Sequence, residues 1–156
     1  MFRLEQHTIG KGDFMNQNKE MLTSLLHTVQ MGQTGIRCVQ DKAIRTDLRS
    51  ELSDQLNEYD QIEKEALRLA KARGWTLTNV NPIVTTMSRM MSMLQLMTGD
   101  VDSKIAGMLI QGNTRGVILG VKNLNHCDQT DSQITQLANR LLNRENMNIQ
   151  KSQTFL

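Results

Sequence analysis

The sequence predicts an all-α protein, a bundle of four long helices with a shorter helix between the second and the third. Three observations lead to this prediction. A chain of 156 residues is long enough to form one domain with a sizeable core. Aromatic residues make up only 3% of the chain, so the core must be built from aliphatic side chains and methionine. One proline and 10 glycines leave few points at which a helix has to stop.

The first long helix is predicted from Gln17 to Val39. Its apolar positions alternate steps of three and four residues and form one stripe, which consists of Leu22, Leu25, Val29, Gly32, Ile36 and Val39. His27 lies off this stripe, so we expect it to meet solvent. Residues 1–14 are expected to be a disordered tail or the product of a start codon assigned too early, because Lys11 to Phe14 can be encoded by a ribosome-binding sequence in front of Met15. The helical domain then spans residues 15–156.

The second long helix is predicted from Thr46 to Arg73, with Gly74 as its C-terminal cap. Its inward stripe is Leu48, Leu52, Gln55, Tyr59, Ile62, Ala66 and Leu69. Two polar residues, Gln55 and Tyr59, therefore stand where apolar ones are expected.

A methionine-rich helix is predicted to follow, with Asn81 as N-cap, Pro82 in its first turn and an end near Thr98. About 17 residues would span roughly 25 Å. We expect this helix to cross along the outside of the bundle with its methionines inward. The stripe that faces the core is Ile83, Val84, Met87, Met90, Met91, Leu94 and Met97, whereas Met93 and Leu96 fall outside it.

The third long helix, from Val101 to Asn125, is capped by Asp100 or Asp102 and is apolar almost all round, so it is expected to be the central element. Three glycines lie on one side of it at intervals of four residues: Gly112, Gly116 and Gly120. Together they cost the helix roughly 3 kcal/mol relative to alanine. We expect them to allow close packing of a second helix, with Gly32 and Gly35 as partners.

The last helix is predicted from Asp128 or Thr130 to Gln150. It presents Ile134, Leu137, Ala138, Leu141, Leu142 and Ile149 inward, with Glu145 in the middle of this face. Two interpretations of Glu145 remain open: it pairs with a cation such as Arg37 or Lys104, or it is wet in a frayed terminal turn.

The stretch "SKIAGMLIQGNTRGVILGVKNLN" at Ser103 to Asn125, together with the helix spacing, resembles uncharacterised bacterial ferritin-like four-helix bundle proteins from about Met15 to the C-terminus. A shorter stretch, "KARGWTLT" at Lys71 to Thr78, resembles ferritin-like spore-coat proteins more weakly. The resemblance implies a ferritin-like bundle whose additional crossover helix is the methionine-rich one. Metal-binding members of that superfamily carry inward glutamates and Glu-x-x-His pairs. None of the three histidines here follows a glutamate by three residues, so we expect no di-iron site, no metal, no cofactor and no enzymatic activity.

Candidate functional residues fall into three groups. An interior polar cluster of Gln55, Tyr59, Asn113 and Glu145, with Asn123 near it, forms a hydrogen-bond network or lines a small-ligand pocket. Met87, Met90 and Met91 pack in the core or, as thioethers, bind Cu(I). His126 and Cys127 are either a reactive thiol site or ordinary loop residues.

The formal net charge is only +2 and no block of like charge occurs, so nucleic acid is not an expected partner. Two cysteines and the lack of a signal sequence suggest the cytosol, and no apolar stretch reaches membrane-spanning length. In a crossover bundle Cys38 and Cys127 lie at opposite ends and cannot form a disulfide. The function expected is non-catalytic, through a homodimer or binding of a protein partner. The alternatives are a redox or metal-handling protein and a structural spore-coat-like component.

Overall fold

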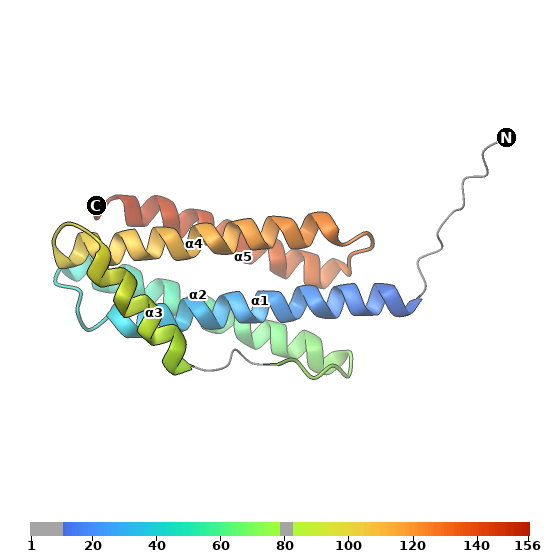
Figure 1. Ribbon diagram of the computed structural model, residues 1–156. Coiled ribbons are helices and arrows are strands. Elements are labelled where there is room, and N and C mark those ends of the chain that lie inside the picture. Colours follow the sequence, from blue (N-terminus) through green and yellow to red (C-terminus); the bar gives the residue numbers. More distant parts are fainter. Residues whose placement is uncertain (1–10, 79–82) are drawn as a thin grey trace.

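The computed structural model describes residues 11–78 and 83–156, and these form five helices (Figure 1). They are α1 (Lys11–Val39), α2 (Thr46–Ala72), α3 (Ile83–Leu96), α4 (Val101–His126) and α5 (Ser132–Gln153). The prediction of an all-α bundle with a short helix between the second and third long ones is confirmed. Helix α1 begins at Lys11, earlier than predicted, so the last four residues of the tail expected at 1–14 are helical. The rest of that tail, residues 1–10, and the cap expected at Asn81 and Pro82 lie outside the described residues.

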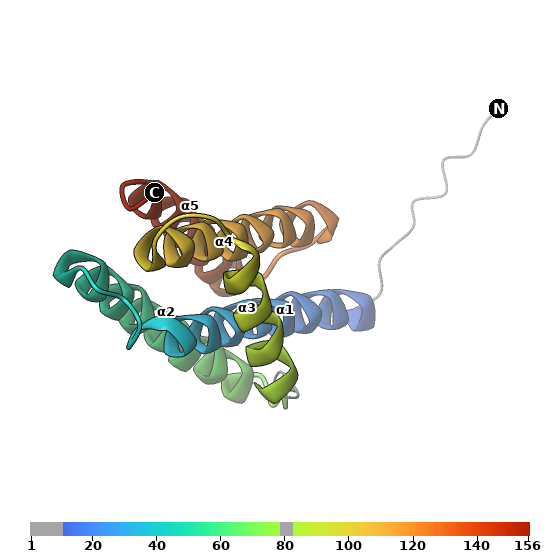
Figure 2. The ribbon, with the colours of Figure 1, turned by 60° about the vertical axis from the view of Figure 1, so that its left-hand side comes forward.

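Between α2 and α4 the chain returns from the end of the bundle where α2 stops to the end where α2 began. Figure 1 shows α2 and α4 running in one direction and α1 and α5 in the other, so the α2–α4 connection crosses the bundle. Figure 2 shows that α3 crosses α1 steeply near the end at which α1 stops, instead of lying along it. Cys38, in the last turn of α1, and Cys127, directly after α4, therefore lie at opposite ends, and both are free.

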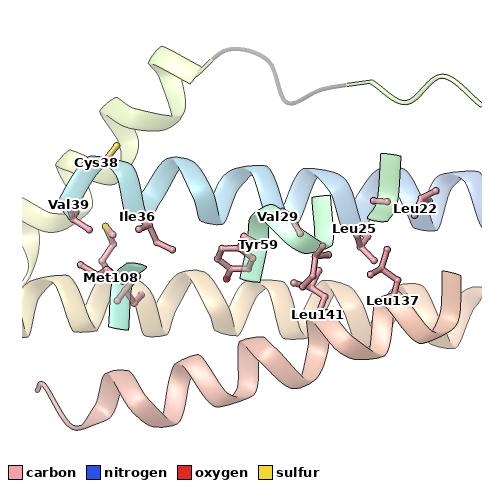
Figure 3. Packing of buried hydrophobic residues seen from close by; sticks show 14 of the residues in the cluster. Leu22, Leu25, Val29, Ile36, Cys38, Val39, Tyr59, Met108, Leu137 and Leu141 are labelled. Carbon is pink, nitrogen blue, oxygen red and sulfur yellow. The ribbon is translucent and has the colours of Figure 1, made fainter. Parts of the chain in front are cut away.

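The core follows the predicted apolar stripes most closely in α2. Every residue of its predicted stripe is buried, including Gln55 and Tyr59. Figure 3 shows the Tyr59 ring in the middle of the core, in the space between α1 and α4, with Val29 and Ile36 on α1 near it. The polar positions of α2 are therefore interior positions, and each must find a partner inside the protein.

The prediction that α4 is the central helix is wrong for its second half. Buried α4 residues stop at Gly116, and beyond it Ile118 and Val121 are 51% and 40% exposed. The cause is α3, which covers only the first part of α4, so that the apolar residues of the last three turns have no helix above them on that side.

Helix α3 packs its methionines against the bundle. Leu94 is buried, and Met90, Met91, Met93 and Met97 contact the core from partly buried positions. The expectation that Met93 faces away is wrong, and Met87, expected inside, is exposed. The rest of the predicted stripe that the structure describes, from Met90 to Met97, faces the bundle as expected.

Two aspartates fix the end of the bundle at which α4 begins. Asp100 caps α4, since its side chain accepts from the Ser103 backbone N–H at 2.9 Å. Asp102 is buried and accepts from the backbone N–H groups of Ile44 and Arg45 at 2.8 and 2.9 Å. Arg45 is the N-cap residue of α2 and makes no side-chain cap. Asp102 therefore anchors the two residues directly before α2 to the start of α4.

Two glycines next to helix ends have a positive φ angle. Gly74, which follows α2, has φ +69°, and Gly99, before α4, has φ +102°. Both lie in the left-handed region that side chains disfavour, which agrees with Gly74 as the residue that ends α2. None of the helices within the described ranges is both long and apolar enough to traverse a lipid bilayer.

Candidate ligand-binding cavity

A cavity of about 320 Å³ opens where α3 crosses the bundle. Its walls come from all five helices, and most of the lining is apolar. Helix α1 contributes Gly32 and Gly35, α3 contributes Met90 and Met93, and α4 contributes Gly112 and further residues. This volume lies in the range of small-molecule sites, about 300–1,000 Å³.

The glycines provide the space for the cavity and its polar floor. A Cβ at Gly32 would lie 2.6 Å from the Tyr59 ring, and a Cβ at Gly116 would collide with the Glu145 carboxylate. A Cβ at Gly112 meets nothing within 4 Å because that position faces the cavity. The expected contact of two glycine-rich backbones is therefore not what these residues make. Side chains approach them instead.

The remaining glycines of that expectation also meet side chains. Gly35 on α1 faces the Met90 sulfur, at 3.2 Å from an added Cβ, and Gly120 on α4 faces Leu142, at 3.6 Å. On the shared face of α4, Gly116 thus lies against a carboxylate, Gly112 faces open space and Gly120 lies against an apolar side chain.

Three side chains form a hydrogen-bonded unit in the floor of the cavity. The Tyr59 hydroxyl donates to Asn113 Oδ1 at 3.0 Å, and Asn148 Nδ2 donates to the same oxygen at 3.1 Å. Asn113 Nδ2 in turn donates to the Leu109 carbonyl at 2.7 Å. These bonds join α2, α4 and α5. Burial is the main reason that the pKa of Tyr59 rises well above 10, so the phenol stays protonated and acts as a donor.

Glu145 lies beside this unit but outside its bonds. The side chain is only 2% exposed, and its Oε2 has no hydrogen-bond partner in the described part of the chain. Burial raises the pKa of the Glu145 carboxyl from 4.5 to about 8, so the group is mostly protonated at neutral pH. Neither earlier interpretation holds: Arg37 contacts Asp60 at 3.7 Å instead, and the carboxyl is not wet.

Gln55 has a similar position on α2. It is fully buried and lines the cavity. Its Nε2 donates to Glu51 at 3.0 Å, whereas its Oε1 finds no donor among the residues that the structure describes. The cavity thus borders on two side chains, Gln55 and Glu145, that each carry one buried oxygen without a hydrogen-bond partner among the described residues.

The mouth of the cavity is basic. Arg89 on α3 and Arg115 on α4 line it, and both are exposed. Across residues 11–78 and 83–156, neither guanidinium has an acidic partner. His27, expected in solvent, is half-buried at the same mouth, and its Nε2 lies 2.7 Å from the Thr78 carbonyl, to which it donates.

Sequence reasoning missed several residues of α5. The buried positions of this helix are Ile134, Leu137, Leu141, Glu145, Asn148 and Ser152. Continuing the steps of three and four beyond Glu145 gives Asn148, not the apolar Ile149, which is only half-buried. Helical spacing therefore predicted the buried residues of α5 better than residue polarity did. Asn123, placed near the cluster by the sequence, instead donates to Ser24 Oγ at 2.7 Å.

His126 and Cys127 each have a backbone carbonyl as hydrogen-bond partner. The His126 ring Nδ1 lies 2.7 Å from the Lys122 carbonyl, and the Cys127 thiol donates to the Gln129 carbonyl at 3.4 Å. Burial raises the pKa of the Cys127 thiol, whereas an activated thiol needs a lowered one. In the part of the chain that the structure describes, no three His, Cys, Asp or Glu residues lie together in a way that could hold a metal ion.

The fold has a counterpart among solved structures. A conserved hypothetical protein, Rv2844, from Mycobacterium tuberculosis superposes with a TM-score of 0.69, over 90% of this chain and 98% of the other. The two sequences are 11% identical. The likeness is one of fold alone. No model of a known protein family matches the sequence, and no curated protein matches it either.

Proposed function

We propose that this protein is a non-catalytic, ferritin-like helical bundle that binds a small, mainly apolar molecule in the cavity under α3. The observation that carries the proposal is the cavity itself, about 320 Å³, lined by methionines and glycines and floored by buried polar side chains. Such a combination of an apolar wall with a few convergent polar groups is typical of ligand sites. Methionine suits it further because its flexible thioether adapts to the shape of a ligand.

The ferritin-like part of the proposal rests on the order of the helices. The crossover between α2 and α4 brings the second and third long helices parallel, as in bundles with one long connection. Metal-binding ferritin-like bundles carry carboxylates and imidazoles in the core, whereas the buried polar side chains here include Gln55, Tyr59, Asn113 and Asn148. The chain's neutral polar groups there suit hydrogen bonding to a ligand. Location in the cytosol, with both thiols free, belongs to the same proposal.

A cavity-filling variant tests the binding. Gly112→Leu extends a side chain into the cavity from a position where an added Cβ meets nothing. Thr114→Leu is the matched control, because it adds the same side chain at an exposed position of α4 outside the cavity. With hexanol as an apolar probe in isothermal titration calorimetry, we expect saturable binding to the wild type and the control, and at least ten-fold weaker binding to Gly112→Leu. Equal binding by all three proteins would refute a site in the cavity.

Self-association is the second candidate function. Ile118 and Val121 lie one turn apart on α4 and are 51% and 40% exposed. A second copy of the chain would cover both residues in a symmetric dimer. Multi-angle light scattering of the wild type, Ile118→Lys and a control, Leu67→Lys on α2, tests this. If the wild type and Leu67→Lys are dimers and Ile118→Lys is a monomer, self-association through α4 is supported. If the wild type is a monomer at a concentration on the order of 10⁻⁴ M, self-association is rejected.

The redox or metal-handling alternative has less support. Its thiol, Cys127, has a raised pKa and donates to the Gln129 carbonyl, while the His126 ring bonds to the Lys122 carbonyl. A copper site would need the sulfurs of Met87, Met90 and Met91 to converge on one point. Met90 and Met91 instead pack their side chains against the core, and Met87 is 41% exposed.

A further inference from the structure

The floor of the cavity contains acceptors without donors. Glu145 Oε2 and Gln55 Oε1 are both buried and lack a hydrogen-bond partner within the described residues, and both side chains line the cavity. Two donors near them are already used, since the Tyr59 hydroxyl and Asn148 Nδ2 both donate to Asn113 Oδ1. Arg144 Nε and Nη2 donate to neither free oxygen. A buried acceptor left unsatisfied costs about 1–3 kcal/mol in general, so a group that supplies donors to both oxygens is strongly favoured there.

No ion pair joins Glu145 to a basic side chain within the described residues. Burial raises the pKa of the Glu145 carboxyl. The charged and titratable groups that face the cavity or adjoin Glu145 are few. They are His27 from α1, Tyr59 from α2, Arg89 from α3, Arg115 from α4 and Arg144 from α5.

None of these groups takes the place of a cationic partner. Arg89 and Arg115 are exposed at the mouth, and His27 is bonded to Thr78. Arg144 acts on Tyr59 by its charge, but its Nε and Nη2 are buried with no partner of their own in the described chain.

We propose that the cavity takes a primary monoamine with an apolar body, whose ammonium group binds Glu145 and Gln55 and displaces the proton of Glu145 to solvent. This inference rests on the proposed function and names the class of its ligand. An ammonium group has three N–H donors, enough for both free acceptors, whereas a hydroxyl has one. Glu145 passes from the neutral acid to the carboxylate, and the released proton goes to the buffer. No bond other than that O–H bond is broken.

The size and charge of the cavity narrow the class further. At roughly 30 Å³ for each water-sized group, 320 Å³ holds about ten non-hydrogen atoms. The two arginines at the mouth disfavour a second positive charge at the outer end of the ligand. A monoamine therefore fits better than a diamine, and an anionic outer end is compatible with the site.

Isothermal titration calorimetry with hexylamine, hexanol and hexanoate tests the inference. These probes share one apolar chain and differ only in the end group. At pH 7 hexylamine, like a lysine side chain, is protonated. We expect it to bind the wild type at least ten-fold more tightly than hexanol does, and to release close to one proton, measured by comparing two buffers with different ionisation enthalpies. Its affinity should rise about ten-fold from pH 6 to pH 7 and level off above pH 8.

Variants separate this inference from the proposed function. In Glu145→Gln, which keeps the shape of the side chain, hexylamine should lose its advantage over hexanol and the proton release should vanish. Gly112→Leu should bind none of the probes. If hexanol binds the wild type as tightly as hexylamine, or no proton is released, the amine inference is overturned while the cavity remains a binding site. If no probe binds, or Gly112→Leu binds them as the wild type does, both proposals are overturned. The proton release is measured on the wild type, so this test does not depend on the folding of a variant.

Discussion

The buried carboxyl of Glu145 should make the protein less stable as the pH rises. In the folded protein the pKa of this group is about 8, against 4.5 in a solvated carboxyl. Between these two values the folded state holds a proton that the unfolded state has lost. Stability is therefore greatest below pH 4.5 with respect to this group and falls as the pH increases through 8. At 1.36 kcal/mol for each pKa unit, the whole loss is at most about 5 kcal/mol.

That loss is large beside the total stability of a small domain, about 5–15 kcal/mol. Glu145→Gln removes the titration and keeps the size of the side chain. We expect the free energy of unfolding of the variant, relative to the wild type, to rise by several kcal/mol between pH 4.5 and pH 8.5. Urea unfolding followed by circular dichroism measures it. The comparison uses the change with pH, because the new amide also alters hydrogen bonding at every pH.

Glu20→Gln is the control for this experiment, since Glu20 is exposed on α1 and meets solvent in both states. Its stability curve should run parallel to that of the wild type. A Glu145→Gln curve that is also parallel to the wild type over this range would refute the reasoning, because it would mean that the carboxyl ionises in the folded protein as easily as in water.

Three further predictions concern packing, capping and thiol chemistry. Gly32→Ala should destabilise the protein by about 1–3 kcal/mol because the new Cβ would press on the Tyr59 ring. Gly112→Ala should stabilise it by up to about 1 kcal/mol because the new Cβ meets open space. Thermal unfolding checks this, since the melting temperature should fall in the first variant and rise in the second. Asp102→Ala should cost about 1–3 kcal/mol, since two backbone N–H groups lose their acceptor, and an equally stable variant in urea unfolding would contradict this. Cys127 should react with a disulfide reagent more slowly at pH 7 than a free thiol does, because burial raises its pKa, and Cys38 more slowly still; a fast Cys127 would show that the thiol is activated.

The sequence was sufficient for the helices because their apolar periods are regular. The whole inward stripe of α2 is buried, and Gln55 and Tyr59 were placed inside although they are polar. Their positions in the helical repeat predicted that they are buried, and the same spacing predicted that Glu145 lies on the inward face of α5. Where polarity was allowed to override the period, as at Ile149 and Asn148, the prediction failed.

The arrangement around α3 could not be derived in the same way. Helical period states which residues share a side, but not the angle at which a helix crosses its neighbours. The steep crossing of α3 leaves Ile118 and Val121 exposed. It also creates the cavity, because a helix laid along the bundle would cover more of α4. The cavity is thus a consequence of tertiary geometry that no single segment encodes.

Several features that reduce stability converge on this one place. Gly112 costs about 1 kcal/mol relative to alanine in a helix interior, although a Cβ there would meet nothing within 4 Å. Gly32 and Gly116 carry the same intrinsic helical cost, but their neighbours leave no room for a Cβ. Glu145 costs up to about 5 kcal/mol at high pH, and the acceptor of Gln55 is unsatisfied beside it. A chain selected only for a stable core would fill the space at Gly112 and replace Glu145 with an apolar residue. Local departures from stability that gather around a cavity are expected where the space itself has a use, and this concentration is the physical argument for a ligand at that site over a purely structural bundle.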